Sequence, residues 1–453
     1  MPVTPNVVSK LREIVGEANV INNGDQLKAY AVDGKVPAIA VSPGTIEEVS
    51  KIVACVSQER IGIIPRGNGT KMGLGGIPEK ADLTLLTGRL NRITDCDCDN
   101  LTLSVESGIT LNEVQKRLAK EGKGYFLPLD PPFTEKATLG GIIATNSSGP
   151  KRFGYGTGRD MITGMKAVFP NGEVVVSGGK TVKNVSGYDM CKLLIGSMGT
   201  LGIISELIFN LRPLPEKERT LLLSFTTLEE TGRFIHEVLH SQLLPVAIET
   251  LNATAAKRMA SSVAIPPGGN YLAAIGLEGV SESVERQVAE MSNIGKKHGA
   301  LEALNLNSDK NRAFWVRLRD FGQGMKKEDP NYISLKANFL VSKWTQVLKG
   351  FEEIARGAGL DCSFICHAGN GVLYSYLRAD KGNPASLSRL VETFASETVR
   401  NEGNLVVESS PLDVKERIDV WGSSRTDRQI MRRIKEEIDS ARILNPGRFV
   451  GGI

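Results

Sequence analysis

The sequence lacks histidine in its first half and any concentration of one charge. Only four of the 453 residues are histidines, and none precedes His236. The 55 Lys and Arg residues are nearly balanced by 51 Asp and Glu residues, which leaves a net charge of +4. Because a nucleic-acid binder needs a concentrated basic surface, we expect no nucleic-acid partner.

The sequence also lacks a long apolar run. Its longest stretch without a charged residue, 259–277, has Pro266, Pro267, Gly268 and Gly269 at its centre. A helix exposed to lipid does not tolerate such a centre, so we expect no membrane span. No apolar run follows a basic start at the amino terminus, so no secretory signal is visible and we expect a cytoplasmic protein.

Cysteine is sparse, with six residues in the chain. Without an export signal, this number favours reduced thiols over a disulfide framework. Cys96 lies close to Cys98, and Cys362 lies close to Cys366, but neither pair belongs to the doubled CxxC pattern of a zinc or iron–sulfur site. Packing or loop positions are the favoured interpretation for both pairs.

Length and local patterns indicate several globular units. A chain of 453 residues is long enough for two or three domains of ~150 residues. Capping signals at 4–5, 45–48 and 110–113 each precede an amphipathic run, and β-rich runs flank the second and third of these predicted helices. A turn at 170–172 predicts a hairpin, and the proline-rich charged segment at 213–216 is a candidate domain boundary.

A first glycine-rich loop follows a predicted strand at residues 63–76. Five glycines fall between Gly67 and Gly76, and Arg66 and Lys71 add positive charge. Consecutive amides in such a loop can form a concave nest for a phosphate or pyrophosphate. The spacing matches neither GxxxxGK[ST] nor GxGxxG, because Met72 occupies the last position of the second pattern. Taken alone, such a turn is more often structural.

A second loop, residues 138–158, is also rich in glycine and in threonine or serine hydroxyls. Two such loops can converge on one extended polyphosphate ligand. The alternative, two unrelated surface loops, must explain Ile142 and Ile143, which indicate that the second loop is packed against the protein.

Six motifs occur in a fixed order along the chain. They are PRGNGT at 65–70, ATLGGIIATNSSG at 137–149, YG at 155–156, KNVSGYD at 183–189, GSMGTLGII at 196–204 and NPG at 445–447. Together they resemble the FAD-binding proteins of the vanillyl-alcohol oxidase and p-cresol methylhydroxylase superfamily, through essentially the whole chain. Within it, the chain resembles the glycolate oxidase and D-lactate dehydrogenase branch, and is most similar to the smaller FAD subunit of bacterial glycolate oxidase.

The resemblance implies a set of cofactor-binding residues. Those implied to hold the FAD pyrophosphate are Pro65, Arg66, Gly67, Asn68, Gly69, Thr70 and Lys71. Those implied to line or contact the rest of the cofactor are Pro131, Thr138, Gly140, Gly141, Ala144, Ser148, Tyr155, Gly202, Ile204 and Asn445. For Asn445, a helix C-terminal cap is an equally weighted alternative.

Some members of this superfamily attach FAD through a histidine of the amino-terminal domain. No histidine is available there in this chain. We therefore predict that FAD is bound noncovalently and that denaturation releases it.

The segment 365–377 resembles the metal-binding HxGDGNxH segment of 2-hydroxy acid dehydrogenases. His367 matches its first histidine, but Tyr374 stands at the second, and the later Ala-Glu-His segment corresponds to Val407, Glu408 and Ser409. Tyrosine, with a pKa near ~10, is a poor ligand at neutral pH, and serine needs a neighbouring base to accept a proton. We therefore predict no metal, with His367 and Glu408 as weak candidate ligands.

Basic residues complete the candidate active site. Lys336 and Arg319 resemble the carboxylate-binding residues of the same branch, with Arg317 as an alternative to Arg319. The predicted catalytic set is Tyr374, Lys336, Arg319 and His367, and solvated charges on a helix are the competing interpretation for the basic members. His236 and His240 have the i, i+4 spacing of a metal pair without an acidic third ligand, which favours surface or core roles.

The resemblance implies an α+β protein of three segments. Residues 1–215 form an FAD-binding domain of two αβ subdomains, and residues 216–407 form a cap or substrate domain with an antiparallel sheet and helices. Residues 408–453 return to the FAD domain.

Three functions are compatible with these residues. The favoured one is an FAD-containing oxidoreductase subunit of a glycolate or D-lactate dehydrogenase complex, which relays electrons to an iron–sulfur subunit and works beside a second FAD subunit. In this interpretation its own hydroxy-acid pocket is degraded, because the flavin loops are complete whereas the metal and base positions are not. The alternative is a self-sufficient FAD-dependent 2-hydroxy acid dehydrogenase with a modified, metal-poor active site. A flavin protein that serves only as a scaffold is the third.

Overall fold

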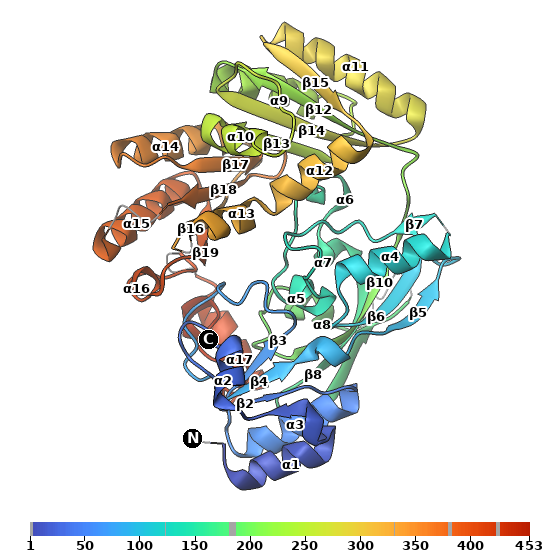
Figure 1. Cartoon of the computed structure of the whole chain (residues 1–453), viewed down its shortest axis with the longest axis vertical. Coiled ribbons are helices and arrows are strands. Elements are labelled where there is room, and N and C mark those ends of the chain that lie inside the picture. Colours follow the sequence, from blue (N-terminus) through green and yellow to red (C-terminus); the bar gives the residue numbers. More distant parts are fainter. Residues whose placement is uncertain (1–2, 123, 181–186, 330, 379–382, 423–425) are drawn as a thin grey trace. The chain divides into compact units, whose positions relative to one another are not determined.

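The computed structural model describes residues 3–122, 124–180, 187–329, 331–378, 383–422 and 426–453 (Figure 1). The chain forms two compact units. Unit 1 comprises Met1–Ser148, Thr157–Leu214 and Ser424–Ile453, and unit 2 comprises Gly149–Gly156 and Pro215–Ser423. Four residues of the predicted KNVSGYD motif, 183–186, lie outside the described residues.

Unit 1 contains short helices and two main sheets. Its helices are α1 (Pro5–Val15), α2 (Gly24–Leu27), α3 (Ile46–Gln58), α4 (Leu111–Glu121), α5 (Leu139–Ala144), α7 (Gly158–Met161), α8 (Met190–Leu194) and α17 (Arg428–Ile438). Its strands are β1 (Val20–Ile21), β2 (Ile39–Val41), β3 (Ile63–Arg66), β4 (Leu83–Leu86), β5 (Ile93–Asp97), β6 (Thr102–Glu106), β7 (Tyr125–Phe126), β8 (Ile162–Val168), β9 (Val174–Gly178), β10 (Ile203–Asn210) and β11 (Arg212–Pro213). Short 3-10 turns lie at Glu17–Asn19, Lys28–Tyr30, Thr87–Arg89 and Val450–Gly452.

The two main sheets of unit 1 correspond to two small αβ layers. One has the strand order β1-β2-β4-β3, and the other has the order β5-β6-β10-β8-β9. In the first sheet β4 pairs in parallel with both β2 and β3. Helix α3 forms the connection from β2 to β3, and the glycine-rich segment 67–82 connects β3 to β4. Helices α1 and α3 bury their apolar faces in the same core as β2, β3 and β4.

Unit 2 is built around one large sheet. Its helices are α6 (Arg152–Tyr155), α9 (Leu228–Leu239), α10 (Ala253–Ala260), α11 (Ser281–Lys297), α12 (Ser308–Arg319), α13 (Phe321–Glu328), α14 (Trp344–Gly357), α15 (Pro384–Arg400) and α16 (Leu412–Lys415), with a 3-10 turn at Val341–Lys343. Its strands are β12 (Lys217–Phe225), β13 (Ala247–Asn252), β14 (Tyr271–Gly279), β15 (Glu302–Leu306), β16 (Ile333–Asn338), β17 (Ser363–His367), β18 (Val372–Leu377) and β19 (Asn404–Ser409).

The eight strands follow the order β15-β12-β14-β13-β17-β18-β16-β19, and every neighbouring pair is antiparallel. Alternate residues of one strand enter different cores, as the two-residue period of a strand requires. Leu221 and Leu223 of β12 pack in a core with α9, α11, α14 and α15, whereas Leu222 packs in a second core with α10, α12 and α13. The sheet is therefore covered by helices on both faces.

The secondary structure confirms the main local predictions. Thr4 caps α1 with Pro5 in its first turn, and Thr110 and Glu113 form the reciprocal capping box of α4. At α3 the predicted box forms only in part, because the Glu48 carboxylate accepts from the amide of Gly44 instead of Thr45. The turn at 170–172 joins β8 and β9 in the predicted hairpin.

The α+β class, with antiparallel sheets and two domains, is as predicted. The chain passes between the two units at other positions than expected, since we expected it to leave the FAD domain once, after residue 215, and to return once, at residue 408. Glu408 still belongs to β19, which pairs with β16 in unit 2, so the chain resumes unit 1 only at Ser424. Residues Gly149–Gly156 also join unit 2, because the amide of Gly154 donates to the carbonyl of Val246 (3.1 Å) and α6 packs there.

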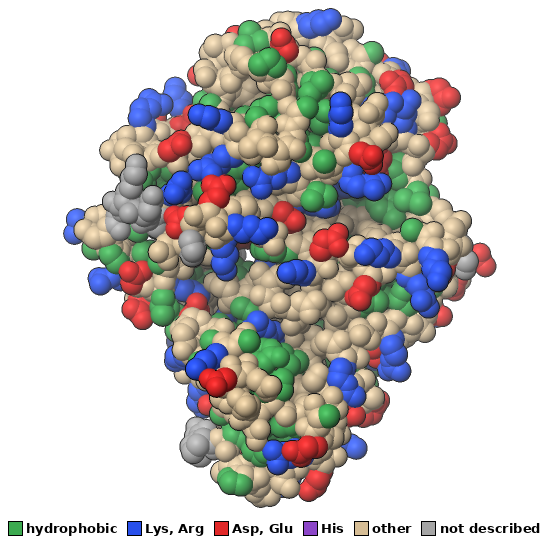
Figure 2. All heavy atoms as spheres, in the orientation of Figure 1, with side chains coloured by type: hydrophobic (Ala, Val, Ile, Leu, Met, Phe, Trp, Pro, Cys, Tyr) green, Lys and Arg blue, Asp and Glu red, His purple; other side chains and the backbone are tan. Residues whose placement is uncertain are grey.

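Acidic and basic side chains are interspersed on the face of the molecule shown in Figure 2. This distribution agrees with the near balance of charges in the sequence. Among the helices of the described residues, none has the length and apolar character that crossing a bilayer requires.

Candidate functional site

The two glycine-rich loops meet in unit 1. Gly67, directly after β3, lies against Thr138 at the start of α5: a Cβ on Gly67 would stand 2.2 Å from the Thr138 hydroxyl oxygen. Only glycine leaves room for this approach. The amide of the Asn68 side chain also donates to the carbonyl of Lys136 (2.9 Å). The two loops therefore form one structure, and the alternative of unrelated surface loops is wrong.

The first loop presents backbone donors. Gly69 has a positive φ of 70°, which turns successive amides toward one side of the loop. Within the described residues, the backbone amides of Asn68, Gly69 and Thr70 have no acceptor. Such a run of amides is the nest that anionic oxygens occupy in phosphate sites.

A pocket lies between these loops and the carboxyl-terminal segment of unit 1. Ten of the residues expected to bind the cofactor line it: Pro65, Gly67, Asn68, Gly69, Thr70, Lys71, Thr138, Gly141, Ala144 and Asn445. The other lining residues are Met72, Pro132, Ala137, Ile142, Thr145, Ser147, Met198 and Arg448.

The remaining expected residues lie elsewhere. The Arg66 guanidinium lies 5.3 Å from the centre of the Tyr30 ring. Gly140 is a packing position, because its Cβ would stand 2.7 Å from the Cβ of Ser107. Tyr155 belongs to unit 2 and donates its hydroxyl hydrogen to Glu278 (2.6 Å). Four further expected residues are buried in unit 1 without lining the pocket: Pro131, Ser148, Gly202 and Ile204.

The carboxyl-terminal segment adds two polar side chains to the pocket. Asn445 donates from its side chain to the carbonyl of Met198 (2.6 Å), and its buried Oδ1 finds no partner in the part of the chain that the structure describes. The alternative role as a helix cap is wrong, because α17 ends at Ile438. Arg448 is 1% exposed and donates to the carbonyl of Met72 (2.9 Å). Burial lowers the pKa of Arg448 to about 10.

A second polar cluster lies on one face of the unit 2 sheet. Five adjacent strands each supply one residue to it: Glu249 from β13, His367 from β17, Tyr374 from β18, Lys336 from β16 and Glu408 from β19. The first four lie on the sheet face that packs against α10, α12 and α13. Leu251, Ile365 and Tyr376 of that core lie two residues from Glu249, His367 and Tyr374 in the same strands, and Lys336 is the register partner of Tyr374.

Glu249 and His367 form the buried centre of this cluster. They are register partners in β13 and β17, and the His367 Nδ1 lies 2.6 Å from the Glu249 carboxylate. Glu249 is 0% exposed and His367 is 5% exposed. Burial raises the pKa of Glu249 well above its usual range, and Arg152 opposes this effect. The carboxyl group engages Nδ1 and thereby orients the His367 ring, with Nε2 as its other nitrogen.

Tyr374 and Lys336 adjoin this pair. The Tyr374 ring centre lies 5.2 Å from that of His367, and the Lys336 ammonium lies 5.7 Å from the Tyr374 ring centre. Lys336 and Tyr374 are direct register partners in β16 and β18. Burial raises the pKa of the neighbouring Tyr376 far above its usual value, so Tyr376 stays a neutral phenol.

The two candidate arginines lie on α12, which packs on this face of the sheet. Arg317 and Arg319 are both half-buried. Each has a buried Nε atom without an acceptor among the described residues. The cluster therefore combines the buried Glu249 carboxyl group with the Lys336 ammonium, a cation that can bind a small carboxylate.

Glu408 occupies an irregular position at the edge of the cluster. Ser334 pairs with Ser409 and Leu335 pairs with Val407, so Glu408 is the extra residue of a β-bulge. Bulges often re-aim a side chain next to an active site. In the described residues, neither His367 nor Glu408 belongs to a group of three clustered His, Cys, Asp or Glu side chains.

The other histidines lie away from this cluster. His236 and His240 stack on each other at the end of α9, with ring centres 4.0 Å apart. His298 ends α11 and contacts Glu237 through Nε2 (2.6 Å).

Two family models match the chain. The FAD binding domain matches residues 37–178, and the C-terminal domain of FAD linked oxidases matches residues 214–449. The chain belongs to the FAD-linked oxidases. It is therefore an FAD-dependent oxidoreductase, as the motifs predicted.

Curated relatives align with almost the whole length of this FAD-linked oxidase. The chain is 28% identical to the glycolate oxidase subunit GlcD of Bacillus subtilis, over 99% of this chain and 97% of that protein. It is 28% identical to a D-lactate dehydrogenase of Archaeoglobus fulgidus, over 93% of this chain and 95% of that protein.

Solved structures share the fold. p-Cresol methylhydroxylase with bound substrate superposes with a TM-score of 0.77 at 19% identity, covering 98% of this chain and 96% of that one. An alkyldihydroxyacetonephosphate synthase superposes with a TM-score of 0.73 at 20% identity, covering 98% of this chain and 86% of that one. The predicted fold is confirmed.

The unit 1 pocket fits the FAD of this family. The amides of Asn68, Gly69 and Thr70 suit a pyrophosphate, and Lys71 and Arg448 supply positive charge. The buried Ser147 Oγ and Asn445 Oδ1 atoms still need hydrogen-bond partners among the described residues, and a bound dinucleotide would supply them.

Sequence reasoning missed Arg448 and Glu249. Arg448 directly follows the NPG motif, of which we assigned only Asn445 to the cofactor. Glu249 is an acidic residue in the apolar strand β13, all six of whose residues are buried. A charge in such a run is a usable signal, because a buried carboxyl group requires a specific partner.

Proposed function

We propose that this chain oxidises a small 2-hydroxy acid, of the glycolate or D-lactate class, at the unit 2 cluster. The buried contact between Glu249 and His367, beside Tyr374 and Lys336, carries the proposal. The names of the curated relatives supply the substrate class.

The proposed reaction converts a 2-hydroxy acid to a 2-oxo acid by loss of two electrons and two protons. Bound FAD supplies the two-electron acceptor. Lys336 and Arg319 bind the substrate carboxylate. His367 accepts the hydroxyl proton at Nε2, while Glu249 orients the ring through its contact at Nδ1.

This proposal departs from the view that the substrate pocket is degraded. Tyr374 and Ser409 stand where 2-hydroxy acid dehydrogenases have two histidines. His367 remains, and its buried carboxyl partner Glu249 orients its imidazole as a general base requires. Tyr374 then acts as a neutral group that positions the substrate beside Lys336.

The electron acceptor is a separate part of the proposal. The name of GlcD as a glycolate oxidase subunit supports a complex, and we propose that the chain passes electrons within it to an iron–sulfur subunit, beside a second FAD subunit. Mass spectrometry of proteins that co-purify with the native chain tests this part independently of substrate oxidation.

Anaerobic flavin bleaching tests the substrate proposal. We expect D-lactate or glycolate to reduce the enzyme-bound FAD, and His367→Gln to slow this reduction by about 100-fold, as loss of a general base does. Tyr374→Phe and Lys336→Met should also weaken it, the latter mainly through substrate affinity.

His298→Gln is the matched control, since His298 also contacts a glutamate but lies at the end of α11. Flavin that binds normally and stays oxidised with both acids would contradict the proposal. So would equal rates in the His367→Gln and His298→Gln variants.

A further inference from the structure

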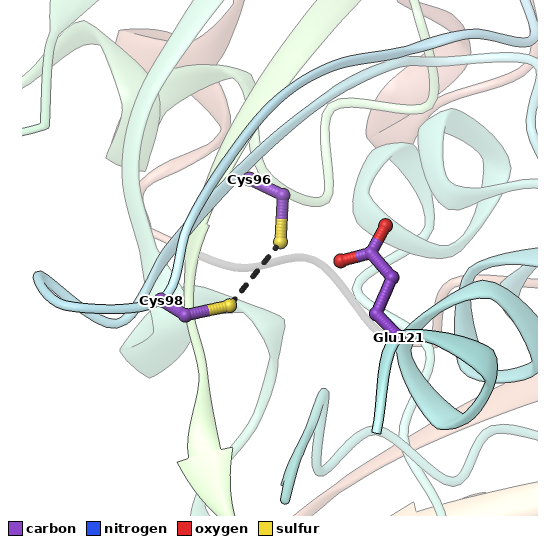
Figure 3. A group of neighbouring side chains, drawn as sticks. All are labelled: Cys96, Cys98 and Glu121. Atoms are coloured by element: carbon purple, nitrogen blue, oxygen red, sulfur yellow. Dashed lines mark hydrogen bonds between the residues drawn. The ribbon is translucent and has the colours of Figure 1, made fainter. Parts of the chain in front are cut away.

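Two cysteines and a glutamate of unit 1 converge away from the FAD pocket. Cys96 in β5 and Cys98 just after it have sulfur atoms 3.6 Å apart. One ligand atom from each of Cys96, Cys98 and Glu121 lies within 4.8 Å of the others. Figure 3 shows the two sulfurs and the carboxylate pointing toward one another, with Glu121 reaching in from the end of α4.

The spacing of the sulfurs matches a shared metal. Two thiolates bound at ~2.3 Å to a tetrahedral zinc ion stand ~3.8 Å apart, and a thiolate and a carboxylate oxygen on the same ion stand ~3.5 Å apart. The observed sulfur separation of 3.6 Å is close to the first of these values. A disulfide requires a much shorter sulfur distance of about 2.05 Å.

Local structure explains why both thiols face the same way. Cys96 lies in β5 and Cys98 in the turn directly after it, and both sulfurs face Glu121 at the end of α4. Asp95 pairs with Lys180 (2.9 Å), and Asp97 accepts from the amide of Asn100 (3.1 Å).

The group of Cys96, Cys98 and Glu121 is partly buried but open to solvent on the side of Glu121. Cys98 is 9% exposed and Cys96 is half-buried, whereas Glu121 is exposed. Glu121 also lies 3.8 Å from the Arg117 guanidinium, one turn earlier in α4. An exposed ion pair of this kind contributes little stability, so the carboxylate can exchange it for a cation.

We propose that Cys96, Cys98 and Glu121 bind one zinc ion, with water or an external ligand in the fourth position. Binding releases the two thiol protons as the two sulfur–zinc bonds form, so affinity rises with pH. None of the three residues lines the FAD pocket. The ion links β5 to the end of α4, and its role is to hold these two elements of unit 1 together.

Zinc uptake by the reduced, FAD-loaded full-length chain tests the proposal. The protein is treated with a phosphine reductant and a chelator, then dialysed against ZnCl2 with a competing chelator, and bound zinc is measured by elemental mass spectrometry. We expect one zinc per chain. We also expect zinc to slow alkylation of Cys96 and Cys98, mapped by peptide mass spectrometry, and to raise the midpoint of thermal unfolding.

Three variants locate the ion. Cys96→Ser/Cys98→Ser should abolish tight uptake, and Glu121→Gln should weaken it by about 10-fold or more while leaving flavin content unchanged. Cys55→Ser, at a half-buried single thiol of α3, is the matched control and should bind like the parent. Because Glu121 is exposed, its variant folds even where the cysteine variant does not.

Two results would overturn the proposal. One is that the parent chain, once reduced, takes up no stoichiometric zinc. This outcome counts equally when Cys96 and Cys98 form a disulfide before the reduction. The other is equal zinc affinity in the parent, the Glu121→Gln variant and the cysteine variant.

Discussion

Replacement of Gly67 by alanine should separate the two loops that form the FAD pocket. The added Cβ would stand 2.2 Å from the Thr138 hydroxyl oxygen and 2.9 Å from its methyl carbon, whereas ordinary contacts begin at 3.4 Å. One of the loops must therefore move by about 1 Å. Overpacking of this kind costs about 1–3 kcal/mol, which corresponds to about 5- to 150-fold weaker FAD binding if the bound state carries the whole cost.

Gly73→Ala is the matched control in the same loop. A Cβ there meets nothing within 4 Å, and Gly73 does not have a positive φ. Titration of apoprotein with FAD, followed by flavin fluorescence, should give parent-like affinity for Gly73→Ala and clearly weaker affinity for Gly67→Ala.

A second substitution tests whether Thr138 causes the loss. Thr138→Ala removes both clashing atoms, but it also removes the hydroxyl that accepts from the amide of Gly141 (3.3 Å), a cap with a contribution of about 1 kcal/mol. The double variant should therefore bind FAD better than Gly67→Ala alone. If Gly67→Ala binds like Gly73→Ala, the contact between the loops does not shape the pocket and the reasoning fails.

Three further predictions follow from buried groups and from the position of the histidines. Glu249→Gln should lower the rate of anaerobic flavin reduction by about 100-fold and shift its pH profile. Glu237→Gln, at the half-buried pair with His298, should leave both unchanged, and equal effects of the two variants would contradict the role of Glu249. Acid precipitation should leave all flavin in the supernatant, because unit 1 has no histidine for a covalent bond; a yellow pellet would refute this. Burial raises the pKa of Cys362 to about 12 and raises that of Cys366 well above its usual value. Both thiols should therefore resist alkylation at neutral pH until the chain is unfolded, and rapid labelling of the folded protein would disprove their burial.

The sequence was most informative where chemistry is local. Gly67, Asn68 and Gly69 signal a nest because glycine and asparagine tolerate the required backbone angles, and the structure places them in the pocket with Thr138 and Asn445. Thr110 and Glu113 signal a helix start because their capping bonds span only three residues.

Local patterns did not distinguish packing glycines from ligand-binding ones. Gly140 shares its motif with Gly141, yet only Gly141 lines the pocket. Gly140 instead packs against Ser107, the residue that directly follows β6. Tyr155 lies near the same motif in sequence but in unit 2 of the fold, where Glu278 holds its hydroxyl.

The sequence alone determined the class of protein, its glycine-rich loops and the lack of any histidine before His236, because each depends on residue identity or short spacing. The tertiary structure decided which distant side chains meet. Glu249 reaches His367 across 118 positions only through the order and register of β13 and β17, and Glu121 joins Cys96 and Cys98 only where α4 ends beside β5. Such contacts depend on how strands pair and helices pack, and the spacing of apolar residues along the sequence does not specify either.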